Sequence, residues 1–260
     1  MMFARLSRLS RLSRLPGGPA RNAFQAGALV AVLALAACAS PSSRFYTLGG
    51  ASVGASGSTP AGASSVRTAA APAWLIEVAP IDVPPQVAKT QLVVQTGPTQ
   101  VKVLEEERWA SLPGDELRRA LSTSLTQQLN TIDVYGTAYS DTTPVYRVSV
   151  NVQRFESWPG SHALIDAVWS VRAVRSTAVM TCRSVVSEQV GSGYDSLVDG
   201  HRRALQRVSE QVAGALRAMA AASSASAGAA AAGASSSQAK GAARVNVPAC
   251  PSDGAAVAAG

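Results

Sequence analysis

The chain has 260 residues and a formal net charge of +7. Residues 1–25 hold five arginines and no acid, so removing this segment from the balance leaves +2. The overall charge is therefore no argument for nucleic-acid binding, which requires a basic patch on the folded domain. We expect no nucleic acid among the partners.

The N-terminal segment has the order of a secretory signal. The arginine-rich residues 1–25 precede an apolar run, residues 26–35, which is too short to cross a bilayer as a permanent helix. Small residues follow, as in a signal peptide before its cleavage site. The arginines form no Arg-Arg pair, which favours general secretion over twin-arginine export.

A lone cysteine ends this segment. The run Leu35-Ala36-Ala37-Cys38 resembles the lipobox of bacterial lipoproteins. The resemblance implies that residues 1–37 are removed and that Cys38 receives a diacylglyceryl group on its thiol and an acyl group on its new amine. Each buried CH2 contributes roughly 0.8 kcal/mol, so several chains anchor a protein firmly. The alternative is an ordinary signal with an incidental cysteine.

The residue after Cys38 is Ala39, rather than the aspartate that retains many Gram-negative lipoproteins at the inner membrane. By this similarity we expect the outer membrane, on its periplasmic face. Residues 38–73 are predicted to be the lipidated N-terminus and a flexible tether, because residues 51–73 are almost all Ala, Gly, Ser, Thr and Pro. A relaxed coil of about 35 residues spans roughly 30 Å, which would let the domain stand clear of the lipid.

The first half of the predicted domain, residues 74–220, reads as strands followed by a helix. Residues 74–83 are mostly apolar and are followed by Pro84-Pro85, which predicts a strand and a turn. Residues 91–95 and 100–104 predict a hairpin around Gly97-Pro98. A helix is expected to begin near Pro113, because leucines recur on one face at positions 117, 121, 125 and 129.

The second half alternates between apolar and polar residues over three segments. The segments begin near Tyr146, Ile165 and Ala178, and they predict an antiparallel meander with one buried face. A long amphipathic helix is expected from near Asp195, with apolar residues every seven positions from Val198 to Met219. The predicted fold is α+β: a mostly antiparallel sheet covered on one face by two helices, in a single domain. Residues 221–260 form an Ala/Ser/Gly-rich tail.

Two further cysteines, Cys182 and Cys250, are candidates for a disulfide. Disulfides persist in the oxidising compartments that exported proteins reach. A bridge would close a loop of roughly 70 residues and stabilise the fold by about 4 kcal/mol. The alternative is two free thiols. Their spacing fits no zinc motif, and the chain has only two histidines, so no metal is expected.

The sequence offers little for catalysis. It has no GxxxxGK[ST] motif and no GxGxxG after a strand, so the chain is not itself an ATPase and no cofactor is expected. The run Glu105-Glu106-Glu107 is predicted to be a solvated strand edge, since adjacent strand residues point to opposite faces. His201 is expected at the boundary of the last helix's apolar face, and His162 in a surface turn. We predict that the protein is not an enzyme.

Several segments occur in a familiar order. Within ten residues of the lipobox comes Arg44-Phe45-Tyr46-Thr47-Leu48, then VAPIDVPPQVAKTQLVVQTG, then LEEERWASLPGDELRRALSTSLTQQL with Arg108-Trp109 ahead of the helix. Together they resemble the PqiC (YmbA) family of ABC-type transport auxiliary lipoproteins. The resemblance implies a non-catalytic partner of MCE-domain and ABC-type lipid transport proteins, with a role in membrane integrity.

Four residues are candidates for partner binding: Arg108, Trp109, Phe45 and Tyr46. Trp and Arg are enriched in interface hot spots, but we favour a role for Trp109 in closing the core beside the helix start, because that role needs no partner. We expect Phe45 and Tyr46 to dock on the domain as an added strand; the alternative is a place at the membrane interface, where aromatic residues are favoured. Two alternative functions remain open, a periplasmic lipid-binding carrier and a structural envelope lipoprotein that forms a homo-oligomer.

Overall fold

The computed structural model describes residues 42–49, 71–233 and 247–251. Of these, all from Ser43 onward belong to one compact unit, Ser43–Gly260. The predicted signal and Cys38 lie outside the described residues. None of the helices in the described ranges combines the length and the apolar character needed to cross a bilayer.

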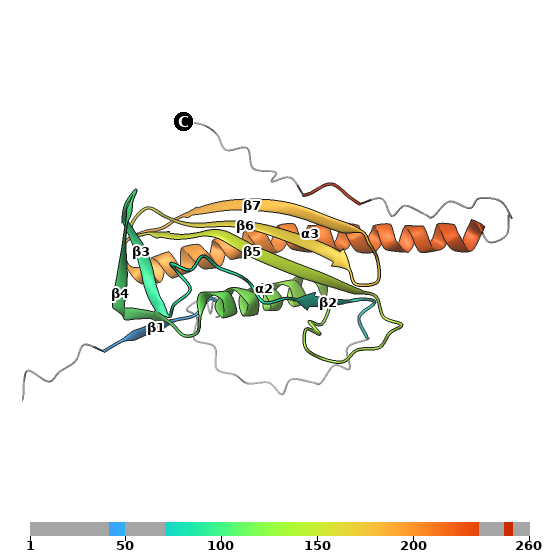
Figure 1. The fold of residues 1–260 in the computed structure, drawn as a ribbon, viewed down its shortest axis with the longest axis horizontal. Helices are drawn as coiled ribbons and strands as arrows, with labels where there is room; N and C mark the ends of the chain where they lie inside the picture. The colour runs from blue at the N-terminus through green and yellow to red at the C-terminus, as the bar shows by residue number, and fades with distance from the viewer. Residues whose placement is uncertain (1–41, 50–70, 234–246, 252–260) are drawn as a thin grey trace, which may run out of the picture. The chain divides into compact units, whose positions relative to one another are not determined.

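In the described residues, seven strands form two sheets, which Figure 1 shows. The first has the order β1-β4-β3, and the second the order β2-β5-β6-β7. The strands are β1 (Arg44–Tyr46), β2 (Leu75–Val78), β3 (Gln91–Gly97), β4 (Gln100–Trp109), β5 (Val145–Trp158), β6 (His162–Ala173) and β7 (Val179–Gln189).

The predicted α+β class is confirmed, but the sheets are mixed. The hairpin β3–β4 and the meander β5–β6–β7 are antiparallel, as short turns require. By contrast, β1 pairs with β4 and β2 pairs with β5 in parallel. Each of these two strands is separated from its partner by a long stretch of chain, so no hairpin turn fixes its direction.

Two helices cover one face of the second sheet. Helix α2 (Pro113–Leu129) begins with proline in its first turn and buries Leu117, Leu121 and Leu125, as the leucine spacing predicts. Helix α3 (Tyr194–Gly233) packs along β6 and β7 and against α2. It continues past the predicted tail boundary at residue 221, consistent with the high helix propensity of alanine, and its last turns extend beyond the sheet (Figure 1).

The start of α2 lies very close to the backbone that follows β2. A Cβ built on Gly114 would stand 2.6 Å from the Ile81 carbonyl oxygen. We expect Gly114→Ala to lower the free energy of unfolding by about 2 kcal/mol, because either the helix or the Ile81 backbone must move. Gly97→Ala is the matched control, since nothing lies within 4 Å of its Cβ position. Chemical denaturation of both variants checks this, and equal stabilities would contradict it.

The predicted disulfide is present between Cys182 of β7 and Cys250, which are separated by 68 residues. It holds residues 247–251 beside β7, the edge strand of the second sheet, with Cys250 Sγ 3.3 Å from the Thr181 carbonyl oxygen. Pro251 lies against Gly214 of α3. The bridge therefore fastens a distant C-terminal segment to the sheet edge.

Candidate anchoring and docking site

The short strand β1 docks on the domain directly after the predicted lipidation site. Its three residues pair in parallel with Glu107, Arg108 and Trp109 of β4. The Ala110 amide donates to the Tyr46 carbonyl at 2.7 Å and extends the pairing. The prediction that this segment docks as an added strand is confirmed.

The first contact that holds β1 is the carboxylate of Glu107. It is buried, and it accepts hydrogen bonds from the Tyr46 hydroxyl at 2.6 Å and from Arg44 Nε at 3.0 Å. Burial, and then the bond to Glu107, raise the pKa of Tyr46 well above its usual value. The predicted solvated edge is therefore wrong for Glu107, although Glu105 does face solvent. The difference arises because β1 covers this part of β4.

The second contact is the carboxylate of Glu116, in the first turn of α2. Its Oε2 accepts the Thr47 hydroxyl at 2.6 Å and the Leu48 amide at 2.9 Å, and its Oε1 accepts the Ser111 hydroxyl at 2.5 Å. Burial alone would raise the pKa of Glu116, but these three hydrogen bonds together lower it below its usual value. Helix α3 adds Arg202, which donates to the Thr47 carbonyl at 2.6 Å.

We call these contacts of residues 44–48 with Glu107, Glu116 and Arg202 the β1 contact cluster. It revises the prediction that residues 38–73 are a tether. From Cys38 to Arg44 the chain has six residue steps, which span at most about 20 Å. The Ala/Gly/Ser/Thr-rich stretch connects Leu48 to β2, and both are buried in the same domain, so it is a connection within the domain and does not set the distance to a membrane.

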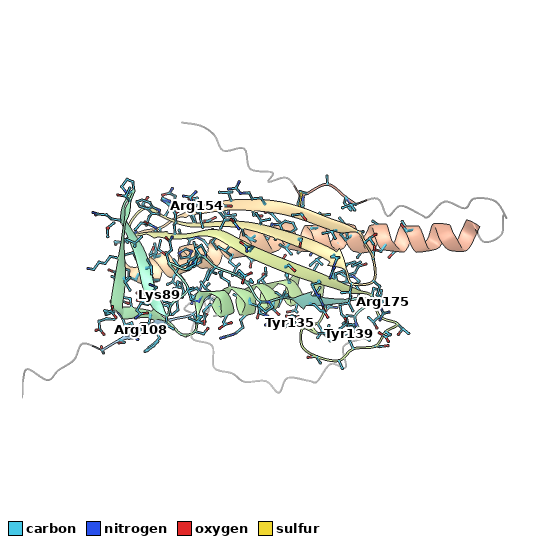
Figure 2. The ribbon with its side chains drawn as sticks, in the orientation of Figure 1. Lys89, Arg108, Tyr135, Tyr139, Arg154 and Arg175 are labelled. Carbon is cyan, nitrogen blue, oxygen red and sulfur yellow. A yellow bond between two sulfur atoms is a disulfide. The ribbon has the colours of Figure 1, made fainter. Side chains whose placement is uncertain are left out.

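The four residues predicted for partner contact occupy different environments. Trp109 is 2% exposed and packs edge-on against Phe155 at a centroid distance of 6.0 Å, so it closes the core. Tyr46 is buried at Glu107. Phe45 is 66% exposed, and it pairs in register with Arg108, whose side chain is one-third exposed (Figure 2). Only Phe45 and Arg108 therefore offer surface to a partner.

His201 is fully buried, which contradicts its predicted place at the edge of the apolar face. Its Nε2 lies 2.8 Å from the Ser157 hydroxyl of β5, and its ring stacks on Phe155 at 4.1 Å. Nδ1 has no hydrogen-bond partner, so no third group orients the ring as a catalytic base would require. The geometry is that of a polar contact within the core.

Burial lowers the pKa of His201 to about 3 from an ordinary 6.5. The unfolded chain thus takes up a proton here below about pH 6.5, while the folded chain does not. We expect stability to fall by about 1.4 kcal/mol per pH unit as the pH drops through this window. Denaturation of His201→Gln at several pH values checks this, because the variant should lose that part of the slope. An unchanged slope would contradict it.

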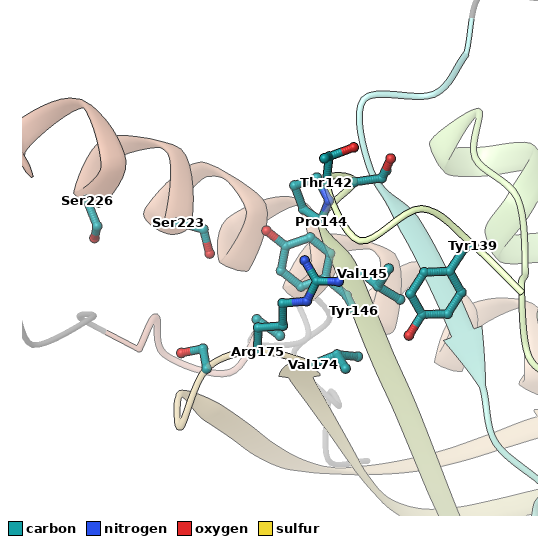
Figure 3. A pocket seen from close by; sticks show the side chains of 12 residues that line it. Tyr139, Thr142, Pro144, Val145, Tyr146, Val174, Arg175, Ser223 and Ser226 are labelled. Carbon is teal, nitrogen blue, oxygen red and sulfur yellow. The ribbon is translucent and has the colours of Figure 1, made fainter. Parts of the chain in front are cut away.

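A pocket of about 330 Å³ lies at the end of the second sheet that is far from β1 (Figure 2). Figure 3 shows the pocket from close by. Three segments line it: the loop before β5 with the start of β5, the end of β6 with the turn that follows it, and the extended part of α3. Its walls are mainly apolar, and its polar lining residues include Tyr139, Ser223, Ser226 and Arg175, which pairs with Asp141. Sequence reasoning missed this pocket, because no local pattern marks residues that three separate segments contribute.

Within the described ranges, no cluster of three or more His, Cys, Asp or Glu side chains is placed to hold a metal ion.

Comparisons with known proteins identify a family and a shared fold. The model of a family described as ABC-type transport auxiliary lipoprotein component matches residues 58–213, more than half of the chain. No curated protein matches significantly. The chain is 18% identical to an uncharacterized protein of known crystal structure, with a TM-score of 0.50 over 66% of this chain and 97% of that one, which shows a shared fold.

Two further crystal structures are similar over smaller parts. A Xanthomonas campestris protein of the family designated DUF330 is 20% identical, with a TM-score of 0.42 over 55% of this chain and 85% of that one. A candidate lipoprotein from Caulobacter crescentus CB15 is 14% identical, with a TM-score of 0.26 over 38% of this chain and 76% of that one.

Proposed function

Because this chain belongs to the family of ABC-type transport auxiliary lipoprotein components, we propose that it is a non-catalytic, lipid-anchored member of an envelope transport system. More specifically, the protein is similar to PqiC (YmbA), is acylated at Cys38, and lies on the periplasmic face of the outer membrane. Its partners are MCE-domain and ABC-type proteins that move lipid and maintain membrane integrity.

One observation supports this role above the others: the β1 contact cluster joins the segment after Cys38 to the domain. Glu107 and Glu116 hold residues 44–48 through the side chains and backbone of that segment. These contacts link the segment after Cys38 firmly to the domain, as an anchored protein requires. The link from lipid to domain is short, so the domain has a restricted position at the membrane.

A second candidate function is lipid carriage, and the pocket favours it. Its volume of about 330 Å³ lies at the small end of the range for ligand sites, and its mainly apolar walls suit part of an acyl chain. Native mass spectrometry of the purified full chain tests this. A bound lipid that Val174→Arg abolishes would support carriage, and a lipid-free protein would count against it.

The leading proposal is tested by affinity purification of the full chain from detergent-solubilised envelopes. We expect MCE-domain or ABC-type components to co-purify with the native protein. A Cys38→Ala variant that keeps its signal is the control for anchoring, and it should lose these components if the membrane position matters. Recovery of the anchored protein without any transport component would contradict the proposal.

A further inference from the structure

The strand nearest the predicted anchor exposes an aromatic side chain. Phe45, in the middle of β1, is 66% exposed, while its neighbour Tyr46 is buried. The strand that β1 pairs with, β4, exposes two more apolar side chains, Val101 and Val103. The two valines precede Arg108, the partner of Phe45, by seven and five residues along β4, so Phe45 is a separate exposed aromatic side chain. An aromatic residue suits the boundary between water and lipid.

The length of the chain identifies the partner. This step depends on the proposed acylation of Cys38. Phe45 is seven residue steps from Cys38, so its backbone lies within about 25 Å of the modified thiol whatever path the chain takes. The headgroup region on each side of the hydrocarbon core is several ångströms thick. The anchor therefore keeps this surface near the bilayer.

The β1 contact cluster fixes which end of the domain faces the lipid. Glu107 and Glu116 hold the strand on both sides of Phe45, so β1 cannot turn independently of β4 and α2. The strands β1, β3 and β4 lie at one end of the domain, and Arg175 and the end of β6 lie at the other (Figures 1 and 2). A short link to β1 therefore brings the first end, which we call the anchored end, toward the membrane.

Charge contributes little to this contact. Arg44 pairs with Glu107, and Arg108 lies 3.8 Å from the exposed Glu105 carboxylate. Lys102 of β4 adds a positive charge, but Glu106 lies on the same strand. The contact is therefore apolar and interfacial, and it does not require anionic lipid.

We propose that the anchored end rests on the lipid surface, with Phe45 among the headgroups and Arg108 beside it. The pocket and the extended end of α3 then face away from this membrane, toward the periplasm. Phe45 and Arg108 contact lipid in this arrangement, and partner proteins use other surfaces.

The test uses the full mature lipoprotein in vesicles of phosphatidylethanolamine and phosphatidylglycerol. With Cys38 acylated and Cys182 bridged to Cys250, a single introduced cysteine is the only free thiol. We would attach an environment-sensitive fluorophore to Phe45→Cys, Arg108→Cys and Arg175→Cys, the last being the matched control for the second. Quenching by lipids brominated near the headgroup reports contact with the bilayer.

We expect quenching of about twofold or more at positions 45 and 108, and none at 175. Equal quenching at all three positions, or none at any, in protein that floats with the vesicles would overturn the orientation while leaving the anchor intact. Shielding of position 45 only after a purified transport partner is added would assign the surface to protein. Failure to float would overturn the anchor and this inference with it.

Discussion

Replacing Glu116 with alanine is expected to lower the free energy of unfolding by about 3 kcal/mol and to release residues 44–48 from the domain. The substitution removes the acceptor for the Thr47 hydroxyl, the Leu48 amide and the Ser111 hydroxyl at once. A buried donor without a partner costs about 1–3 kcal/mol, and the cost of several is partly offset by water that enters. Chemical denaturation gives the loss of stability, and limited trypsin digestion at Arg44 reports the release of β1.

The matched control is Glu105→Ala, because Glu105 is exposed on β4. It should change the free energy of unfolding by no more than about 0.5 kcal/mol.

The pKa of Glu116 is lowered in the folded protein, so its contribution to stability is present above the carboxyl's usual pKa and is lost as the pH falls below it. Equal trypsin resistance of the two variants would show that Glu116 does not hold the strand.

Removing the disulfide is expected to have an effect of similar size. Cys250→Ser should lower the free energy of unfolding by about 4 kcal/mol, because the bridge closes a long loop and restricts the unfolded chain. Position 250 is preferable to position 182, since Cys182 is buried and a hydroxyl there would add a separate cost. The measurement is denaturation with and without a reducing agent.

Reduction should destabilise the native protein and leave Cys250→Ser unchanged, which makes the variant its own control. Residues 247–251 should also become accessible to protease in the variant, because the bridge holds them beside β7. A native protein that reduction leaves equally stable would contradict the predicted contribution.

Local patterns predicted most of the helices and strands correctly. The alternation from Tyr146 and from Ile165 onward predicts β5 and β6, and a four-residue leucine spacing predicts α2. Such patterns reflect which face of an element is buried. They carry no information about which distant strand lies alongside, so the parallel partners of β1 and β2 could not be predicted.

The candidate site was predicted in part, for the same reason. The sequence predicts that residues 45–48 dock on the domain. Their contacts, however, come from Glu107 and Glu116, more than 60 residues away. The three adjacent glutamates at positions 105–107 look alike in sequence. Only Glu107 is buried, because β1 lies over it. The burial of His201 likewise depends on Ser157 and Phe155 of β5.

The composition of residues 51–73 led to too large a predicted distance between the anchor and the domain. Small and polar residues are typical of flexible linkers, but composition does not tell a linker from a connection between two strands of one domain. The position of β1 distinguishes the two, because the chain is already fixed to the domain at residue 44, before the low-complexity segment begins. The domain is consequently held much closer to Cys38 than the length of the low-complexity segment suggests.

The most direct test of this account is the intact mass of the mature protein, measured together with its distribution between membrane and soluble fractions. We predict a chain that begins at Cys38, carries three acyl groups and is recovered with the outer membrane. A mature chain that begins elsewhere, carries no lipid and remains in the soluble periplasmic fraction would contradict it.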